Sequence, residues 1–203
     1  MTSGFKCCLR ASSWWIRARI PLILKETIFI GSFLSGFGRI LSDLKGGSMN
    51  IILMRHGEAV PFAVNDGDRE LTPKGKSEAS RTGTQLKNGG WIPTSLFCST
   101  RIRAQQTAAL VLQSLGSDLE PEIIDGITPE DDWPDAIAVI EAHASDGSLF
   151  VFHQPILTEI VGYLTEGQAQ VDVQPRAVPA TAYLLKLSAF LPGAATLVGA
   201  YQP

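Results

Sequence analysis

Residues 50–57 read Asn-Ile-Ile-Leu-Met-Arg-His-Gly, and this stretch decides the fold prediction. Its four consecutive apolar residues, Ile51 to Met54, are typical of a strand that is buried on both faces of a parallel sheet. A basic pair, Arg55-His56, follows the apolar run directly. In open α/β sheets, ligands bind beyond the carboxyl ends of the strands. The stretch therefore predicts both a central strand and the edge of the sheet at which a site would lie.

Strand-like and helix-like segments alternate along the rest of the sequence. Further strands are predicted at 95–98, 122–124, 148–152, 181–187 and 196–201, and amphipathic helices at 72–87, 101–115, 133–144 and 156–164. Thr72-Pro73 has the residue types of a helix cap followed by a first helical residue. This alternation predicts an α/β fold, a three-layer sandwich in which helices cover both faces of a mainly parallel sheet.

The first 48 residues differ in charge from the rest of the chain. Residues 1–48 contain seven Lys/Arg and two Asp/Glu, whereas 49–203 contain ten and eighteen. A linker-like Gly-Gly-Ser ends at residue 48, and Met49 follows it. We predict a poorly ordered N-terminal extension over 1–48 and one domain over 49–203. The longest uncharged run of the extension, 27–38, is shorter than the roughly 20 residues of a membrane-spanning helix, so no span is expected. A transit peptide and a basic membrane-surface segment are the functional alternatives.

The composition excludes several classes of protein. The 203-residue chain has a net charge of −3, which argues against nucleic-acid binding because phosphate backbones bind to basic surfaces. Its three cysteines, Cys7, Cys8 and Cys98, form no Cys-x-x-Cys pair, and there are only three histidines, so neither a disulfide framework nor a zinc site is indicated. We expect a monomer in the reducing cytoplasm, with no cofactor and no metal.

Basic residues follow three of the predicted strands. Arg55 and His56 follow the first, Arg101 and Arg103 lie beyond the second, and His153 follows a third. A neutral imidazole can attack phosphorus, and guanidinium groups match phosphate oxygens. A cation at a helix N-terminus is unfavourable unless an anion lies nearby, so the arginine pair favours an anionic ligand. The cluster predicts a phosphoryl-transfer site that needs no metal.

Other polar residues are expected to have structural roles. His143 lies late in a helix, where a cation suits the helix dipole. Cys98 lies on a core strand, so we expect a buried and unreactive thiol. The acidic residues between the first strand and the first helix are expected to form a solvated loop face: Glu58, Asp66, Asp68 and Glu70.

Four short motifs occur in a fixed order along the chain. They are Leu53-Met-Arg-His-Gly-Glu58, Arg69-Glu-Leu-Thr-Pro-Lys-Gly75, Ser99-x-x-x-Arg-Ala-x-Gln-Thr107 and His153-Gln-Pro155. Together they resemble the motifs of the histidine phosphatase superfamily, the phosphoglycerate-mutase-like enzymes. The short domain is most similar to the SixA-type phosphohistidine phosphatases of that superfamily, and residues 1–48 have no counterpart in it.

The resemblance implies a mechanism. His56 would attack phosphorus and become a phosphohistidine, which water would then hydrolyse. Arg55, Arg103 and His153 would hold the phosphoryl oxygens. Arg101 does not match the family's arginine and ranks below Arg103.

Three further positions matter to this expectation. Gly57 would allow a close backbone approach that fixes the catalytic imidazole through its second nitrogen. Thr100 stands where the family commonly has proline. Phe152 stands where the family has a small residue, and we expect it to narrow the pocket or to tilt the second histidine.

The choice of substrate rests on the leaving group. Glu130, Asp131 and Asp132 are the candidates for a general acid. A phosphohistidine needs such an acid less than an ester does, because imidazole is the better leaving group. The chain also has little length for the lid that a small metabolite needs. We therefore predict a phosphatase for phosphohistidine-bearing proteins, of which a histidine phosphotransfer domain is one candidate. The alternatives are a small-molecule phosphomonoesterase and a non-catalytic phosphate-binding module in which Phe152 blocks turnover.

Overall fold

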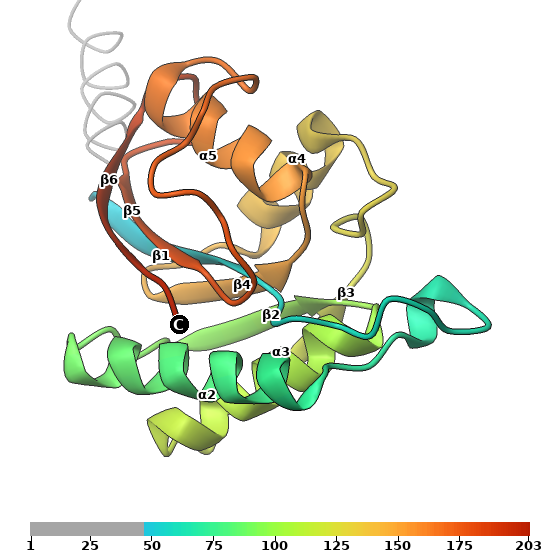
Figure 1. Cartoon of the computed structure of the whole chain (residues 1–203). Helices are drawn as coiled ribbons and strands as arrows, with labels where there is room; N and C mark the ends of the chain where they lie inside the picture. The colour runs from blue at the N-terminus through green and yellow to red at the C-terminus, as the bar shows by residue number, and fades with distance from the viewer. Residues whose placement is uncertain (1–46) are drawn as a thin grey trace, which may run out of the picture. The chain divides into compact units, whose positions relative to one another are not determined.

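The computed structural model describes residues 47–203 (Figure 1). Apart from its last two residues, the extension predicted over 1–48 lies outside the described residues, and so do the transit-peptide and membrane-surface interpretations of it. Within 47–203, no helix combines the length and the apolar character needed to cross a membrane.

Six strands form one sheet in the order β3-β2-β4-β1-β5-β6. Their bounds are β1 Met49–Arg55, β2 Ser95–Ser99, β3 Glu122–Ile124, β4 Ser148–Phe152, β5 Ala182–Leu187 and β6 Ala195–Tyr201. The first four strands are parallel, whereas β5 runs antiparallel to β1 and β6 antiparallel to β5. The predicted mainly parallel sheet is confirmed, and an antiparallel pair of strands closes it.

Helices cover both faces of this sheet. Their bounds are α2 Pro73–Asn88, α3 Ile102–Leu115, α4 Trp133–His143 and α5 Ile156–Glu166, with a short 3-10 turn, η1, at Asp66–Asp68. In Figure 1, α2 and α3 lie on one face of the sheet and α4 and α5 on the other. The predicted three-layer sandwich is therefore confirmed.

Local residue types account for the helix ends. The side chain of Thr72 accepts a hydrogen bond from the Gly75 amide at 3.0 Å, and Pro73 occupies the first turn of α2, as predicted. At its other end, α3 stops at Gly116, whose φ of 69° is a left-handed conformation that costs glycine little.

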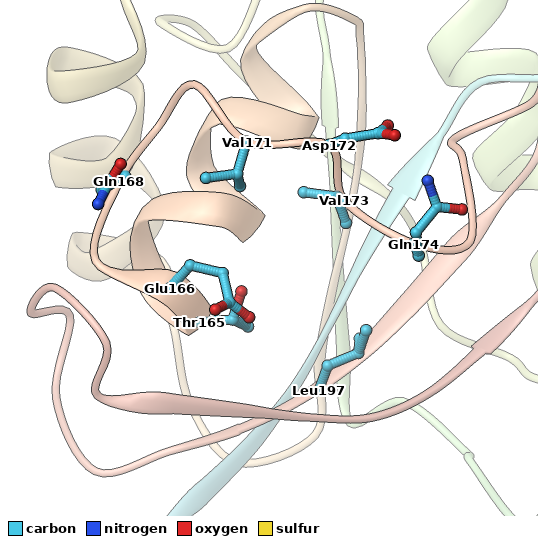
Figure 2. Close-up of a pocket in the computed structure, with 8 residues that line it drawn as sticks. All are labelled: Thr165, Glu166, Gln168, Val171, Asp172, Val173, Gln174 and Leu197. Carbon is cyan, nitrogen blue, oxygen red and sulfur yellow. The ribbon is translucent and has the colours of Figure 1, made fainter.

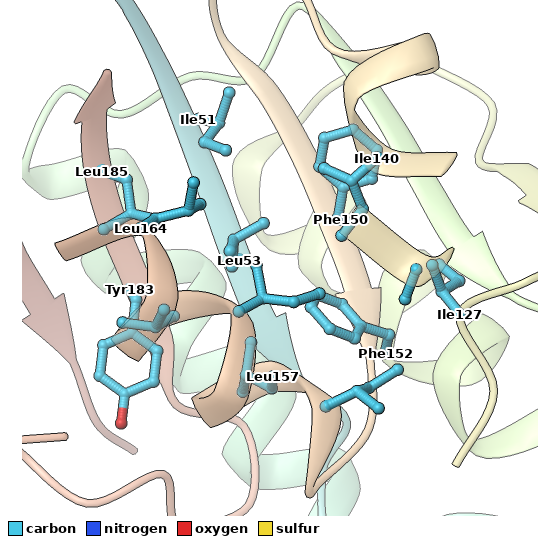
Figure 3. Packing of buried hydrophobic residues seen from close by; sticks show 14 of the residues in the cluster. Ile51, Leu53, Ile127, Ile140, Phe150, Phe152, Leu157, Leu164, Tyr183 and Leu185 are labelled. Atoms are coloured by element: carbon cyan, nitrogen blue, oxygen red, sulfur yellow. The ribbon is translucent and has the colours of Figure 1, made fainter. Parts of the chain in front are cut away.

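The central strand β1 contributes side chains to both hydrophobic clusters of the core, one on each face of the sheet. Ile51 and Leu53 pack in the cluster beneath α4 and α5, whereas Ile52 and Met54 pack in the cluster beneath α2 and α3, because successive side chains of a strand point to opposite faces. Figure 3 shows the first cluster, with Leu53 close to side chains of β4 and α5. Each such buried side chain contributes about 1.5–3 kcal/mol of hydrophobic stabilisation. This burial on both faces holds β1 firmly and so positions the residues that follow it.

Candidate active site

A cavity of about 310 Å³ opens at the carboxyl ends of the parallel strands. It is lined by Arg55, His56, Asp66, Arg69, Arg103, Pro129, Glu130, His153 and Gln154. The register of β1 and β4 pairs Arg55 with Phe152, so His56 and His153 emerge side by side from neighbouring strands. The structure therefore brings the four predicted site residues together, and it leaves Arg101 out of the lining.

The His56 ring is held in one orientation. Its Nδ1 lies 2.7 Å from the carbonyl oxygen of Gly57. Because a carbonyl oxygen can only accept, Nδ1 carries the proton and Nε2 keeps its lone pair. The backbone of His56 is also held, since its N–H donates to Phe152 and its carbonyl accepts from Ala180, both at 3.0 Å. The result is an imidazole whose Nε2 is prepared to act as a nucleophile.

The second histidine, His153, lies against the first. The two ring centroids are 5.0 Å apart and the ring planes are tilted by 55°. Nε2 of His153 lies 2.9 Å from the Ser99 hydroxyl oxygen, whereas its Nδ1 is buried with no hydrogen-bond partner in the described part of the chain. Because buried polar atoms are nearly always paired, this nitrogen marks a place where a hydrogen-bonding group of a ligand would fit.

Burial lowers the pKa values of both histidines. The pKa of His56 falls to about 4, because burial disfavours the charged ring and the neighbouring guanidinium groups of Arg103 and Arg55 oppose a further positive charge. The pKa of His153 falls to about 2, again mainly through burial and then through its proximity to His56. Both rings are therefore neutral at physiological pH, which is the state that a nucleophilic imidazole requires.

We expect the His56 ring signal to titrate with a midpoint near pH 4 in a nuclear magnetic resonance experiment, well below the ordinary histidine value of about 6.5. In the unfolded chain this ring takes up a proton below about pH 6.5, whereas the folded state keeps it neutral. The free energy of unfolding should therefore fall as the pH drops from about 6.5 towards 4, and His56 should contribute no further loss below 4. Urea unfolding at several pH values checks this sign, and a midpoint near 6.5 would contradict the buried, cation-flanked ring.

Arg103 is the most deeply buried cation of the cavity. Its side chain is 4% exposed, and its two terminal nitrogens donate to Asp66, one to the backbone oxygen at 2.8 Å and one to the carboxylate at 3.0 Å. Arg55 donates through Nη1 to the Ala177 carbonyl at 2.7 Å, while its buried Nε has no partner within 47–203. Both guanidinium groups are thus held by the protein at the edge of the cavity.

Asp66 lies on an exposed loop face, as predicted, with its side chain 46% exposed. Its carboxylate pairs with Arg69 at 2.9 Å as well as with Arg103, and these contacts hold its pKa below the ordinary value, with the hydrogen bond from Arg69 as the largest cause. The loop folds back over the start of α3, a non-local contact that residue types alone do not reveal.

Arg101 pairs with a different carboxylate, that of Glu130, at 2.6 Å. With Asp66 beside Arg103, both arginines at the start of α3 therefore have protein anions next to them. These carboxylates offset the unfavourable position of the cations, so the position of the arginine pair does not by itself require an anionic ligand, which stays a prediction.

None of the three candidate acids is set up to donate a proton. Glu130 lines the cavity, but its hydrogen bond from Arg101 lowers its pKa, so it stays ionised at neutral pH. Asp131 accepts hydrogen bonds from the backbone N–H and the hydroxyl of Thr128, at 2.6 and 2.7 Å, and neither it nor Asp132, the N-cap residue of α4, lines the cavity. The carboxyl groups of the cavity wall therefore favour a leaving group that needs no acid from the enzyme.

Two glycines explain why the first two motifs occur together. A Cβ on Gly57 would lie 2.5 Å from the backbone oxygen of Gly75, and a Cβ on Gly75 would collide with the backbone of Glu58. The N–H of Gly57 also donates to the hydroxyl of Thr107, in the third motif, at 3.0 Å. The expectation of a close backbone approach at Gly57 is confirmed.

Gly57→Ala is expected to lower the free energy of unfolding by about 1–3 kcal/mol, because the Gly75 backbone cannot move away without shifting α2. Gly199→Ala is the matched control, since a Cβ there would make an ordinary contact, 3.5 Å from a methyl group of Leu184. Urea unfolding of the two variants compares them directly. Equal midpoints would show that the two motifs are not in tight backbone contact.

The expectation that Phe152 narrows the pocket is wrong. Its side chain is fully buried in the cluster beneath α4 and α5, close to Leu157, as Figure 3 shows. Successive side chains of β4 alternate between the two faces, so the residue before His153 points into this helix layer. Phe152 therefore gives no support to a non-catalytic module.

A larger cavity, of about 470 Å³, lies beside the end of α5 (Figure 2). It is lined by Thr165, Glu166, Gln168, Val171, Asp172, Val173, Gln174 and Leu197. The ionisable groups in this lining are two carboxylates, which repel phosphate, and the lining includes no arginine or histidine. The smaller cavity at the strand ends is therefore the candidate phosphate site.

Two of the expected structural residues behave as predicted. Cys98 is fully buried, and burial raises the pKa of its thiol to about 11, so it stays protonated and unreactive. Nδ1 of His143 lies 2.8 Å from the Val139 carbonyl of the same helix, and its ring packs edge-on against Phe97. Within residues 47–203, no group of three or more His, Cys, Asp or Glu side chains could hold a metal ion.

Known proteins match this chain in sequence. Residues 51–128 match the sequence model of the histidine phosphatase superfamily (branch 1). A protein of Haemophilus influenzae described as a phosphohistidine phosphatase SixA homolog is 34% identical over 140 residues, which cover 64% of this chain and 85% of that protein. A mitochondrial serine/threonine-protein phosphatase Pgam5 of Drosophila ananassae is 37% identical over 71 residues, which are 35% of this chain and 25% of that protein.

Solved structures share the fold. A protein histidine phosphatase SixA complexed with tungstate superposes with a TM-score of 0.66 at 24% identity, over 76% of this chain and 97% of that chain. A phosphoglycerate mutase of Bacillus anthracis superposes with a TM-score of 0.55 at 17% identity, over 76% and 93% of the two chains. At these identities the likeness shows the fold.

Proposed function

Because this chain belongs to the histidine phosphatase superfamily and is a phosphatase, we propose that it removes the phosphoryl group from phosphohistidine in proteins. The observation that carries the proposal is the state of His56. Its Nδ1 proton is donated to Gly57 and its pKa is near 4, so Nε2 offers a lone pair at neutral pH. A neutral imidazole with one free nitrogen is a competent nucleophile towards phosphorus.

The proposed reaction has two steps. Nε2 of His56 attacks phosphorus, a new P–N bond forms, and the P–N bond to the substrate histidine breaks. The departing imidazole leaves as a neutral ring because its other nitrogen carries a proton. Water then attacks the phosphorus on His56, the second P–N bond breaks, and dihydrogen phosphate leaves with the protons of the water while His56 returns to its neutral form. The bond formed in the first step is of the same kind as the bond broken, so the transfer is close to balanced in energy.

Three further residues have proposed roles at the phosphoryl group. Arg103 would exchange part of its contact with Asp66 for phosphoryl oxygens, and Arg55 would bind from the other strand. In the proposed arrangement the Ser99 hydroxyl donates to Nε2 of His153, so the otherwise unpaired Nδ1 of that ring carries the proton and would donate it to a phosphoryl oxygen. Such preorganised donors stabilise the charge of the transferring group.

Two observations favour phosphohistidine over phosphate esters as the substrate. The carboxylates on the cavity wall, Asp66 and Glu130, are both paired with arginines and kept ionised, so neither can protonate an alkoxide leaving group. The Haemophilus influenzae relative, described as a phosphohistidine phosphatase homolog, matches over most of its length.

A phosphomonoesterase is the second candidate, and one observation favours it. Glu130 lies on the wall of the cavity, where release from Arg101 together with burial beneath a bound ester would raise its carboxyl pKa towards the range in which it holds a proton. The partial match to a serine/threonine-protein phosphatase points the same way, because that protein's named substrates are phosphate esters.

A substrate panel separates the two candidates. We expect kcat/KM for a histidine phosphotransfer domain phosphorylated on its histidine to exceed that for glycerol phosphate and for a phosphoserine peptide by at least about 100-fold, because an alkoxide needs a proton from an acid to leave and a protonated phosphohistidine ring does not. Release of inorganic phosphate is the common measurement for all three. Faster turnover of either ester would reverse the assignment.

A further inference from the structure

The loop between β1 and α2 carries two apolar side chains in solvent. Phe62 is 88% exposed and Val64 is fully exposed, and they are the two most exposed large hydrophobic residues of the described chain. The loop, teal in Figure 1, projects beyond the sheet. Isolated surface hydrophobics need no explanation, but a pair on one projecting loop beside a functional cavity does.

The same loop forms a wall of the candidate active site. Its Asp66 and Arg69 line the cavity. Asp66 lies two residues after Val64 and four residues after Phe62. Two residues of chain span at most about 7 Å and four at most about 14 Å, so the backbone at Val64 and Phe62 lies within those distances of Asp66. The apolar pair is thus tied to the rim of the phosphoryl site.

The ends of the loop are held in place. The backbone N–H of Val60 donates to Glu70 at 2.9 Å, and Nε of Arg69 donates to the Val60 carbonyl at 2.7 Å. Beyond the tip, Asp66 is bound to Arg103, on α3. The segment 61–64 is therefore presented between two anchored ends, which limits the entropy lost when a partner binds to it.

We propose that Phe62 and Val64 are docking residues for the phosphorylated protein substrate, whose surface beside the phosphohistidine would be apolar. This inference rests on the proposed function. A folded protein that places a phosphohistidine in the cavity must bring the surface around that residue into contact with the rim of the cavity. A standard interface covers about 800 Å² on each partner, a disc of about 16 Å radius, so an interface centred on the cavity includes the loop tip. A free phosphohistidine or a small ester cannot reach that far.

The docking proposal predicts a difference between large and small substrates. In the double variant Phe62→Ser/Val64→Ser, KM for a histidine phosphotransfer domain phosphorylated on its histidine should rise about ten-fold or more, because truncated apolar anchors commonly cost that much. The kcat/KM for free phosphohistidine should stay within about two-fold of the wild type, since the groups that line the cavity are unchanged. Phe62→Leu, which keeps an apolar side chain at the tip, should retain most of the affinity for the protein substrate.

The matched control is Ile92→Ser/Leu191→Ser. Both residues are exposed, at 52% and 59%. Ile92 precedes β2, and Leu191 follows the end of β5 that pairs with Met49. Both residues therefore lie near the amino-terminal ends of the parallel strands, whereas the cavity lies at their carboxyl ends. This control should leave both substrates unaffected.

The outcomes distinguish the two proposals. If the wild type hydrolyses the phosphorylated domain and the loop variant has an unchanged KM for it, or loses both substrates equally, the docking proposal fails and the proposed function stands. If the wild type hydrolyses only small phosphate esters, the proposed function fails and the docking proposal falls with it. A selective rise in KM for the protein substrate, absent from the control, supports both.

Discussion

His56→Ala is expected to abolish the phosphoenzyme and to lower kcat by at least about 10⁴-fold, because it removes the nitrogen that receives the phosphoryl group. No other described imidazole can substitute for it. In the proposed arrangement the Ser99 hydroxyl donates to Nε2 of His153, so Nδ1 of that ring carries the proton and has no lone pair with which to attack phosphorus. His143 is engaged with Val139 at the end of α4.

The measurement is brief incubation with a phosphohistidine protein carrying labelled phosphate, followed by trapping of label on the enzyme. The label should be acid-labile and alkali-stable, as expected of a phosphohistidine. His143→Ala is the control, and it should acquire label as the wild type does. Label on the His56→Ala variant would mean that another group receives the phosphoryl group.

Arg103→Ala is expected to lower kcat/KM by about 10²–10³-fold, whereas Arg101→Ala should cost about ten-fold or less. The Arg103 side chain is 4% exposed and reaches the cavity, whereas that of Arg101 is 24% exposed and pairs with Glu130. Removing Arg103 also leaves Arg69 as the remaining cationic partner of the Asp66 carboxylate, so the cavity wall loses positive charge and attracts phosphate less.

Steady-state kinetics with the phosphorylated protein, together with competition by inorganic phosphate, check this ranking. Arg103→Lys keeps the charge but not the planar fork and should recover only part of the activity. The reverse order, with Arg101→Ala the more damaging change, would show that the arginine of the third motif corresponds to Arg101 and not to Arg103.

Local features of the sequence were sufficient to predict the elements of the fold. The apolar run 51–54 and the Thr72-Pro73 cap act within a few residues, so the strand and the helix that they predict were found close to their observed bounds. The same reasoning brought Arg55, His56 and His153 to one edge, because parallel strands end on the same side of a sheet.

The departures came from contacts between segments that are far apart in the sequence. Asp66 lies in solvent as expected, but its ion pair with Arg103, across 37 positions of chain, was not foreseen. Phe152 was expected in the pocket, yet its side chain lies in the core. The loop that carries Asp66 folds onto α3. Successive side chains of β4 alternate between the two faces of the sheet, and that of Phe152 points to the face covered by α4 and α5, away from the cavity.

The sequence by itself therefore determined the order and type of the elements, the family motifs and the edge at which the basic residues meet. The tertiary structure alone decided which carboxylates pair with the arginines, which His56 nitrogen keeps its lone pair, and which apolar side chains face solvent beside the cavity. The physical reason is the distance along the chain over which each kind of interaction acts. Caps and periodicity act over one or two turns of chain, whereas ion pairs, burial and the resulting pKa shifts depend on distances that exist only once the layers have packed.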